Sequence, residues 1–227
     1  MRRLTEITAD VLVATAQKYV TTSTVVRGRD GGCLLIDPAV SPEEVAGLAA
    51  DLAGLGLRPD AGFATHPHWD HVLWSRELGD VPRYASGLAV ETAARERDGL
   101  IEGVQGSAPG HDLSLFAVIT PLPGAGQAIG WDGPEAVVVT HQAHAPGHSA
   151  VFLPGDGTLV AGDMCSDLEI PLLDIDQADP VGDYFAALDR YGALPVERVI
   201  PGHGHVGDAA EFRRRLDADR RYLDALS

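Results

Sequence analysis

The segment T-H-P-H-W-D-H at 65–71 follows directly on the apolar run A-G-F-A at 61–64. It places three imidazole side chains and one carboxylate within the short stretch 66–71. Imidazole nitrogens and carboxylate oxygens at this density suit a borderline cation such as zinc. A strand that ends in such a cluster holds its ligands rigidly at the edge of a sheet. The segment therefore predicts metal-dependent chemistry on a β-sheet scaffold.

Other histidines and aspartates stand beside other apolar runs. H-A-P-G-H-S at 144–149 comes after the run 136–140, and Gly162-Asp163 comes after the run 159–161. P-G-H-G at 201–204 comes after the run 198–200. Glycine or proline stands beside most of these groups, and glycine lets the backbone bend sharply so that separate side chains face one point. The strand ends therefore predict one shared site.

The order of elements predicts an α/β protein. In the first third, β-branched runs at 11–16 and 22–26 and a buried strand at 33–37 predict a sheet. Ser41, Pro42 and two acidic residues then begin a helix that runs to about Leu55. The remaining predicted segments are a helix at 87–98, a loop at 99–112, a strand at 113–122, turns at 121–126 and 130–134, strands at 136–140, 150–153, 159–162 and 198–200, and helices at 179–191 and 208–226. Strands that alternate with helices in both halves predict two packed sheets with helices outside.

Composition narrows the function classes. With 227 residues, the chain fits a single domain with a real core. Its formal net charge of −16 repels nucleic acid and anionic lipid, so neither is an expected partner. Two cysteines exclude a disulfide framework, and no apolar run reaches membrane length. The first residues lack the apolar core of a signal peptide, so we expect a cytoplasmic protein.

Taken together, these motifs resemble the metallo-β-lactamase superfamily. The likeness runs from G-C-L-L-I-D at 32–37 through H-x-H-x-D-H at 66–71, A-P-G-H-S at 145–149, G-D at 162–163 and P-G-H-G at 201–204. It implies a four-layer αββα sandwich that spans 1–227 as one domain. It also implies two divalent metal ions, with zinc expected first and iron or manganese as alternatives.

The resemblance implies a role for each residue of the motifs. His66, His68 and His148 would hold the first metal. The second metal would be held by Asp70, His71 and His203, and Asp163 would bridge the two ions. Asp70 would also act in catalysis by orienting the attacking hydroxide. Asp37 and His144 would hydrogen-bond to ligands from behind.

The chemistry agrees with a hydrolase. Two cations about 3.5–4 Å apart can share a water and lower its pKa to about 7, which makes hydroxide available at neutral pH. The leading hypothesis is hydrolysis of a small carbonyl compound: an ester, lactone, thioester or amide. The alternative is an iron-dependent oxidoreductase of the same fold, such as a persulfide dioxygenase. A third hypothesis is a binding protein that has the same fold and no catalytic activity. The substrate and the oligomeric state stay open.

Overall fold

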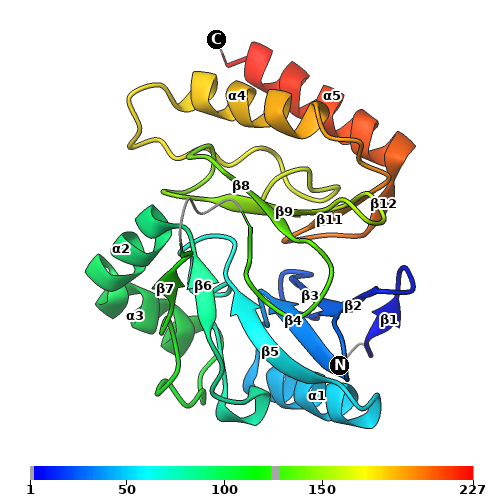
Figure 1. Ribbon diagram of the computed structural model, residues 1–227. Helices are drawn as coiled ribbons and strands as arrows, with labels where there is room; N and C mark the ends of the chain where they lie inside the picture. Colours follow the sequence, from blue (N-terminus) through cyan, green and yellow to red (C-terminus); the bar gives the residue numbers. More distant parts are fainter. Residues whose placement is uncertain (1–2, 124–127, 227) are drawn as a thin grey trace.

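Two β-sheets lie face to face, and helices cover the outer surface of each (Figure 1). The computed structural model describes residues 3–123 and 128–226. Helices α4 and α5 cover one sheet, while α1, α2 and α3 lie on the side of the other sheet (Figure 1). The expected four-layer αββα sandwich is therefore confirmed.

The first sheet contains seven strands in chain order. Strands β1 to β4 are antiparallel neighbours, whereas β4 to β7 are parallel. The parallel steps need crossover connections, and helices or long loops supply them. The elements of this half are β1 (Thr5–Glu6), β2 (Val11–Thr15), β3 (Thr22–Arg27), β4 (Gly32–Ile36), α1 (Pro42–Gly54), β5 (Arg58–Phe63), the 3₁₀ helix η1 (Arg76–Leu78), β6 (Arg83–Ala85), α2 (Gly87–Arg95), α3 (Arg97–Ser107) and β7 (Thr120–Pro121).

The second sheet contains five strands in the order β12-β11-β10-β9-β8. Strands β10 and β11 are parallel and are connected through α4, and the other pairs are antiparallel. Its elements are β8 (Val137–Thr140), β9 (Ser149–Leu153), β10 (Thr158–Gly162), α4 (Pro180–Gly192), β11 (Arg198–Pro201), β12 (Gly207–Asp208) and α5 (Ala209–Asp224). These agree closely with the segments predicted from the sequence.

Strand β4 is apolar throughout because both of its faces are buried. Leu34 and Ile36 pack in the core between the two sheets. Cys33 and Leu35 point to the opposite face and pack against the apolar side of α1. Successive side chains of a strand alternate between faces, so a strand in an inner layer needs apolar residues at every position. Each fully buried aliphatic side chain stabilises the fold by roughly 1.5–3 kcal/mol.

The predicted loop at 99–112 is wrong over most of its length, because α3 continues through Arg97–Ser107. Its glycines suggested a loop, since each costs roughly 1 kcal/mol in a helix. Packing outweighs that cost: Val104 is buried in a cluster with Phe116. Gly103 is required by contact, because a Cβ there would lie 2.9 Å from Cδ1 of Trp69.

The predicted strand at 113–122 is also wrong, since only Thr120–Pro121 pairs with a neighbouring strand. The preceding residues form turns, in which the amide of Phe116 donates to the carbonyl of Leu113 over 3.3 Å. The Phe116 side chain is 1% exposed and fills the core beneath α2 and α3. Its burial explains the apolar pattern that favoured a strand. The turn predicted at 121–126 falls partly outside the described residues.

Candidate metal centre

The loops that follow β5, β8, β10 and β11 bring seven histidine and aspartate side chains together. They form two groups, and within each group one nitrogen or oxygen atom per residue lies within 4.8 Å of the others. The first group is His66, His68, His144 and Asp163, and the second is Asp70, His71 and His203. The parallel pairs β4–β5 and β10–β11 end at this edge, so short loops deliver all seven side chains to one place.

Protein oxygen atoms orient most histidines of the two groups through the ring nitrogen that faces away from the site. Four of them have their Nδ1 atom within hydrogen-bonding distance of a protein oxygen, so that Nε2 points into the site. The pairs are His66 with Thr65 Oγ1 (3.0 Å), His71 with Asp37 Oδ2 (2.9 Å), His144 with the Leu172 carbonyl (2.8 Å) and His203 with the Tyr19 carbonyl (3.1 Å). This arrangement orients imidazoles as metal ligands are usually oriented.

Asp163 belongs to the first group, and its carboxylate also reaches the second group. Its Oδ1 is 3.2 Å from Nε2 of His71 in the second group. Its Oδ2 is 3.4 Å from Nε2 of both His66 and His144 in the first group, and 3.3 Å from Nε2 of His203. Oδ1 is buried and makes no hydrogen bond. A buried carboxylate whose Oδ1 makes no hydrogen bond, and whose two oxygens face imidazole nitrogens of both groups, fits a divalent cation.

His148 does not point into this site, which differs from the expectation that it holds the first metal. Its Nε2 accepts a hydrogen bond from the backbone amide of Asp163 over 3.0 Å, and its Nδ1 lies 3.2 Å from Nε2 of His141. Both ring nitrogens are therefore engaged by protein atoms. His144, expected only as a supporting residue, takes the position beside His66 and His68. The two side chains therefore lie in the opposite of their expected positions.

Desolvation favours the neutral form of His66 and His68 in the first group. It lowers the pKa of His66 well below its usual range, and the neighbouring His71 lowers it further. His68 is exposed on one side, but desolvation by the side chains packed around it lowers its pKa to about 4, and the neighbouring His144 acts in the same direction. Neutral imidazole is the form that ligates a metal, so these nitrogens need no proton release before binding.

In the second group, the pKa of His71 is shifted in the opposite direction. Burial alone lowers the pKa of His71, but the carboxylates of Asp163, Asp70 and Asp37 outweigh it and raise the pKa well above its usual range. Asp163 is the counterpart: burial raises its pKa, but His71 and His66 outweigh burial and hold the pKa well below its usual range. Protonated His71 thus balances the buried carboxylates, and a cation can take over that task.

Asp37 lies beside His71, where the sequence predicted a hydrogen bond to a ligand residue, and it also accepts two hydrogen bonds from Thr65. Its Oδ1 accepts a hydrogen bond from the amide of Thr65 over 2.8 Å, and its Oδ2 accepts one from the Thr65 hydroxyl over 2.6 Å. Oδ2 also lies 2.9 Å from Nδ1 of His71. A carboxylate behind a ligating histidine fixes the ring and raises its basicity.

A family comparison identifies the fold family. The model of the metallo-beta-lactamase superfamily matches residues 17–203. The chain belongs to this superfamily. The match includes every residue of the two groups described above.

Two curated relatives are named hydroxyacylglutathione hydrolase. The one from Gloeobacter violaceus is 32% identical over 124 residues, which is 55% of this chain and 42% of the relative. The one from Synechococcus sp. is 26% identical over 197 residues, which is 84% of this chain and 66% of the relative. The chain therefore spans less than two thirds of either relative's length.

Solved structures agree with the fold. A beta-lactamase domain protein from Burkholderia ambifaria superposes with a TM-score of 0.72 at 20% identity, covering 98% of this chain and 75% of the other. TTHA1623, solved in a di-iron-bound form, superposes with a TM-score of 0.67 at 28% identity. That match covers 89% of this chain and 97% of TTHA1623.

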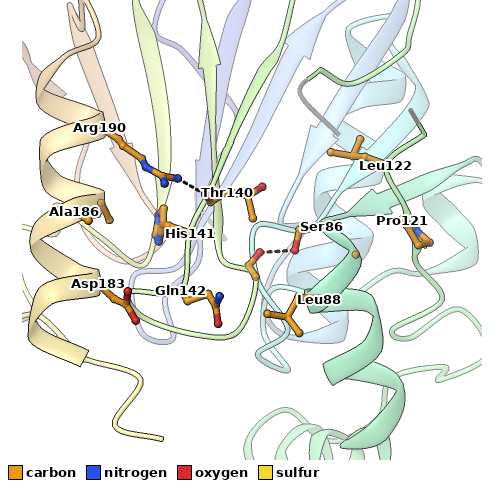
Figure 2. A pocket seen from close by; sticks show the side chains of 13 residues that line it. Ser86, Leu88, Pro121, Leu122, Thr140, His141, Gln142, Asp183, Ala186 and Arg190 are labelled. Atoms are coloured by element: carbon orange, nitrogen blue, oxygen red, sulfur yellow. Dashed lines mark hydrogen bonds between the residues drawn. The ribbon is translucent and has the colours of Figure 1, made fainter. Parts of the chain in front are cut away.

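A cavity of about 620 Å³ opens between α2 and α4 (Figure 2). Arg190 and Asp183 line it from α4, and Leu88 lines it from α2 (Figure 2). His141 also lines it and lies 2.7 Å from the hydroxyl of Tyr191. The volume suits a small molecule. The described residues that line this cavity include none from the two metal-binding groups.

Sequence reasoning gave no role to His141, which the structure places behind His148. Burial lowers the pKa of His141 to about 3, and Arg190 adds to that shift. No spacing rule in the sequence indicates this contact, since His141 directly follows β8 and its partner Tyr191 lies on the distant helix α4.

Among the described residues, no helix combines the length and apolar composition needed to cross a membrane.

Proposed function

We propose that this chain is a metal-dependent hydrolase that binds two divalent ions and acts on a small carbonyl substrate: an ester, lactone, thioester or amide. The observation that carries the proposal is the position of Asp163 between two groups of imidazoles, with a buried oxygen that lacks a hydrogen bond. The donor set of imidazoles and carboxylates matches the preference of zinc and of iron.

In this proposal each ion has its own set of ligands. His66, His68 and His144 would hold the first ion. Asp70, His71 and His203 would hold the second ion, and Asp163 lies close enough to both groups to contribute to either. When bound, such a pair supplies a water of pKa about 7 and positive charge for a developing oxyanion.

The chain's own residues then orient the reactants. Asp70 Oδ2 lies 3.4 Å from Nε2 of His203, at the centre of the second group. Its carboxylate can accept a hydrogen bond from the attacking water and turn a lone pair of that water toward the substrate carbonyl. His68 is exposed, which leaves one side of the first group open for a substrate. Burial of His66 and His71 excludes water from the opposite side.

The relatives guide the choice of substrates. Two of them are named for hydrolysis of hydroxyacylglutathione, so acyl thioesters come first among the candidates. Lactones and simple esters follow, because they share the carbonyl chemistry without the glutathione moiety. The substrate is expected to be a small molecule, since the net charge of −16 repels polyanions.

The test combines metal analysis with a substrate screen. The protein would be purified, depleted of metal with a chelator, reloaded with zinc or manganese, and offered thioesters, lactones, esters, β-lactams and phosphodiesters. We expect two ions per chain and hydrolysis of at least one carbonyl class. A protein that takes up no metal under any loading condition would exclude the proposal.

An iron-dependent oxidoreductase is the second candidate. The observation in its favour is that TTHA1623, which is 28% identical to this chain, was solved in a di-iron-bound form. Iron loading followed by oxygen-electrode measurements on a thiol persulfide separates the two functions. Oxygen uptake without ester, thioester or lactone hydrolysis would favour the oxidoreductase.

A further inference from the structure

Arg215 on α5 joins two loops of the metal centre although it belongs to neither. Its side chain is 3% exposed. Its Nη1 donates to the backbone carbonyl of Cys165 over 3.1 Å and to the backbone carbonyl of His205 over 2.9 Å. Cys165 lies two residues after Asp163, and His205 lies two residues after His203. One guanidinium therefore connects the loops that carry these two site residues.

The same two loops are joined directly as well. The hydroxyl of Ser166 donates to the backbone carbonyl of His203 over 2.7 Å. Asp167 accepts a hydrogen bond from the amide of His205 over 2.8 Å. These contacts lie at the surface side of the loops, while Arg215 holds them from the side of α5. The loops after β10 and β11 thus form one hydrogen-bonded unit.

The position requires an arginine rather than any side chain that fills the space. A buried guanidinium is costly unless its donors are satisfied. Here Nε donates to Glu211 Oε1 over 3.0 Å, and Nη2 lies 3.8 Å from Asp167 Oδ1. Only a planar fork reaches two carbonyls and a carboxylate in different directions at once, whereas a lysine ammonium is a single point charge.

We propose that Arg215 is a positioning residue that fixes the separation of Asp163 from His203 and thereby sets the affinity for the second ion. The inference rests on the proposed function, because it concerns the same metal centre. Partners behind metal ligands typically change metal affinity about 10–100-fold when they are removed. Arg215 does not contact the ligand side chains themselves. It acts on them through the backbone carbonyls of Cys165 and His205.

The test compares Arg215→Lys and Arg215→Met with Arg214→Met. Arg214 is the matched control, because it pairs with the same Glu211 at 2.7 Å but its side chain is 61% exposed. Zinc would be titrated into each metal-free protein in competition with a chromophoric chelator. We expect both Arg215 variants to bind the second zinc at least about tenfold more weakly. The first zinc should stay within about threefold of the wild type, because its three histidines lie on loops that these Arg215 hydrogen bonds do not reach. Arg214→Met should bind both ions as the wild type does.

Ser166→Ala provides a second variant that disturbs the core less. It removes the bond to His203 and the two bonds that the hydroxyl accepts from the amides of Leu168 and Glu169, and it leaves Arg215 in place. We therefore expect a smaller loss that is confined to the second zinc. A role in folding alone would lower the melting temperature of the metal-free protein and leave the ratio of the two zinc affinities unchanged. Folded Arg215 variants with a wild-type ratio would overturn the inference. A wild-type protein that takes up no second zinc would instead overturn the two-ion function.

Discussion

The backbone amide of Asp163 donates a hydrogen bond to Nε2 of His148 over 3.0 Å. His148 therefore supports the loop that carries Asp163 and has no ring nitrogen free for a metal, since its Nδ1 faces His141. A Cβ on Gly162 would lie 2.4 Å from that same Nε2, so the close approach also requires glycine there. The contact distinguishes His148 from His144, which stands in the same loop.

The first prediction separates these two histidines. His144→Ala should bind fewer metal ions and lose activity about 100-fold or more, while its unfolding free energy in the metal-free form changes by less than about 1 kcal/mol. His148→Ala should lower the unfolding free energy by about 2–4 kcal/mol, because it opens a cavity and leaves the Asp163 amide without an acceptor. Metal content by elemental analysis and denaturant unfolding measure the two effects.

The opposite result for the two variants would support the sequence-based prediction that His148 is a metal ligand. If His148→Ala lost metal at unchanged stability and His144→Ala kept both ions, His148 would be the ligand. Gln142→Ala serves as a control in the same loop, because its side chain is exposed.

Sequence alone located the site but not the role of each histidine in it. Most members of the two groups follow a strand by a few residues, as Asp163 follows β10 and His203 follows β11. His148 instead directly precedes β9, which begins at Ser149. That difference in order was the available signal. The spacing of four residues between His144 and His148 cannot indicate which ring faces the site.

The fold was predictable where apolar patterning matched the burial. Strands β4, β9 and β10 were predicted correctly because each is buried on both faces, as Leu34 and Leu35 of β4 illustrate. Helix α3 was not predicted, because Gly103 marks a close contact with Trp69 rather than a break in the helix. The contacts of Arg215 could not be predicted either, because one of its two carbonyl partners, Cys165, lies 50 residues away in the sequence and nothing in the local pattern marks the other.

His68 provides the second prediction because it is the exposed member of its group. His68→Ala should remove one ligand without opening a buried cavity. We expect loss of the first ion and of most activity, with a melting temperature in the metal-free form within about 2 °C of the wild type. Elemental analysis and thermal unfolding monitored by circular dichroism check this. Full activity in a folded His68→Ala protein would contradict the ligand assignment.

Gly202 provides the third prediction. A Cβ at this position would lie 2.0 Å from Oδ1 of Asp163 and 3.0 Å from Cε1 of His71. Gly202→Ala should therefore displace the Asp163 carboxylate and weaken metal binding about tenfold or more, although the added methyl group is small. Gly155→Ala is the control, because nothing lies within 4 Å of a Cβ there. Equal zinc affinity in both variants would show that Asp163 does not depend on this close approach.

Asp219 provides a prediction about pH. Burial raises its pKa to about 7, although the backbone of Cys165 and the charge of Arg215 act in the opposite direction. The folded protein holds this proton more tightly than the unfolded chain does. Protonated Asp219 therefore stabilises the folded state, and this stabilisation is fully present below about pH 4. That contribution is lost as the pH rises toward about 7, and the loss amounts to as much as about 4 kcal/mol.

Asp219→Asn removes this titration and keeps the shape of the side chain. The variant should therefore gain stability relative to the wild type as the pH rises from 4 to 8, with most of the gain between pH 4 and pH 7. Urea unfolding of the metal-free proteins at several pH values measures the difference. Asp217→Asn, at an exposed position of the same helix, is the control and should show no such trend. A difference between Asp219→Asn and the wild type that stays constant across this range would mean that Asp219 is already ionised at pH 4 in the folded protein.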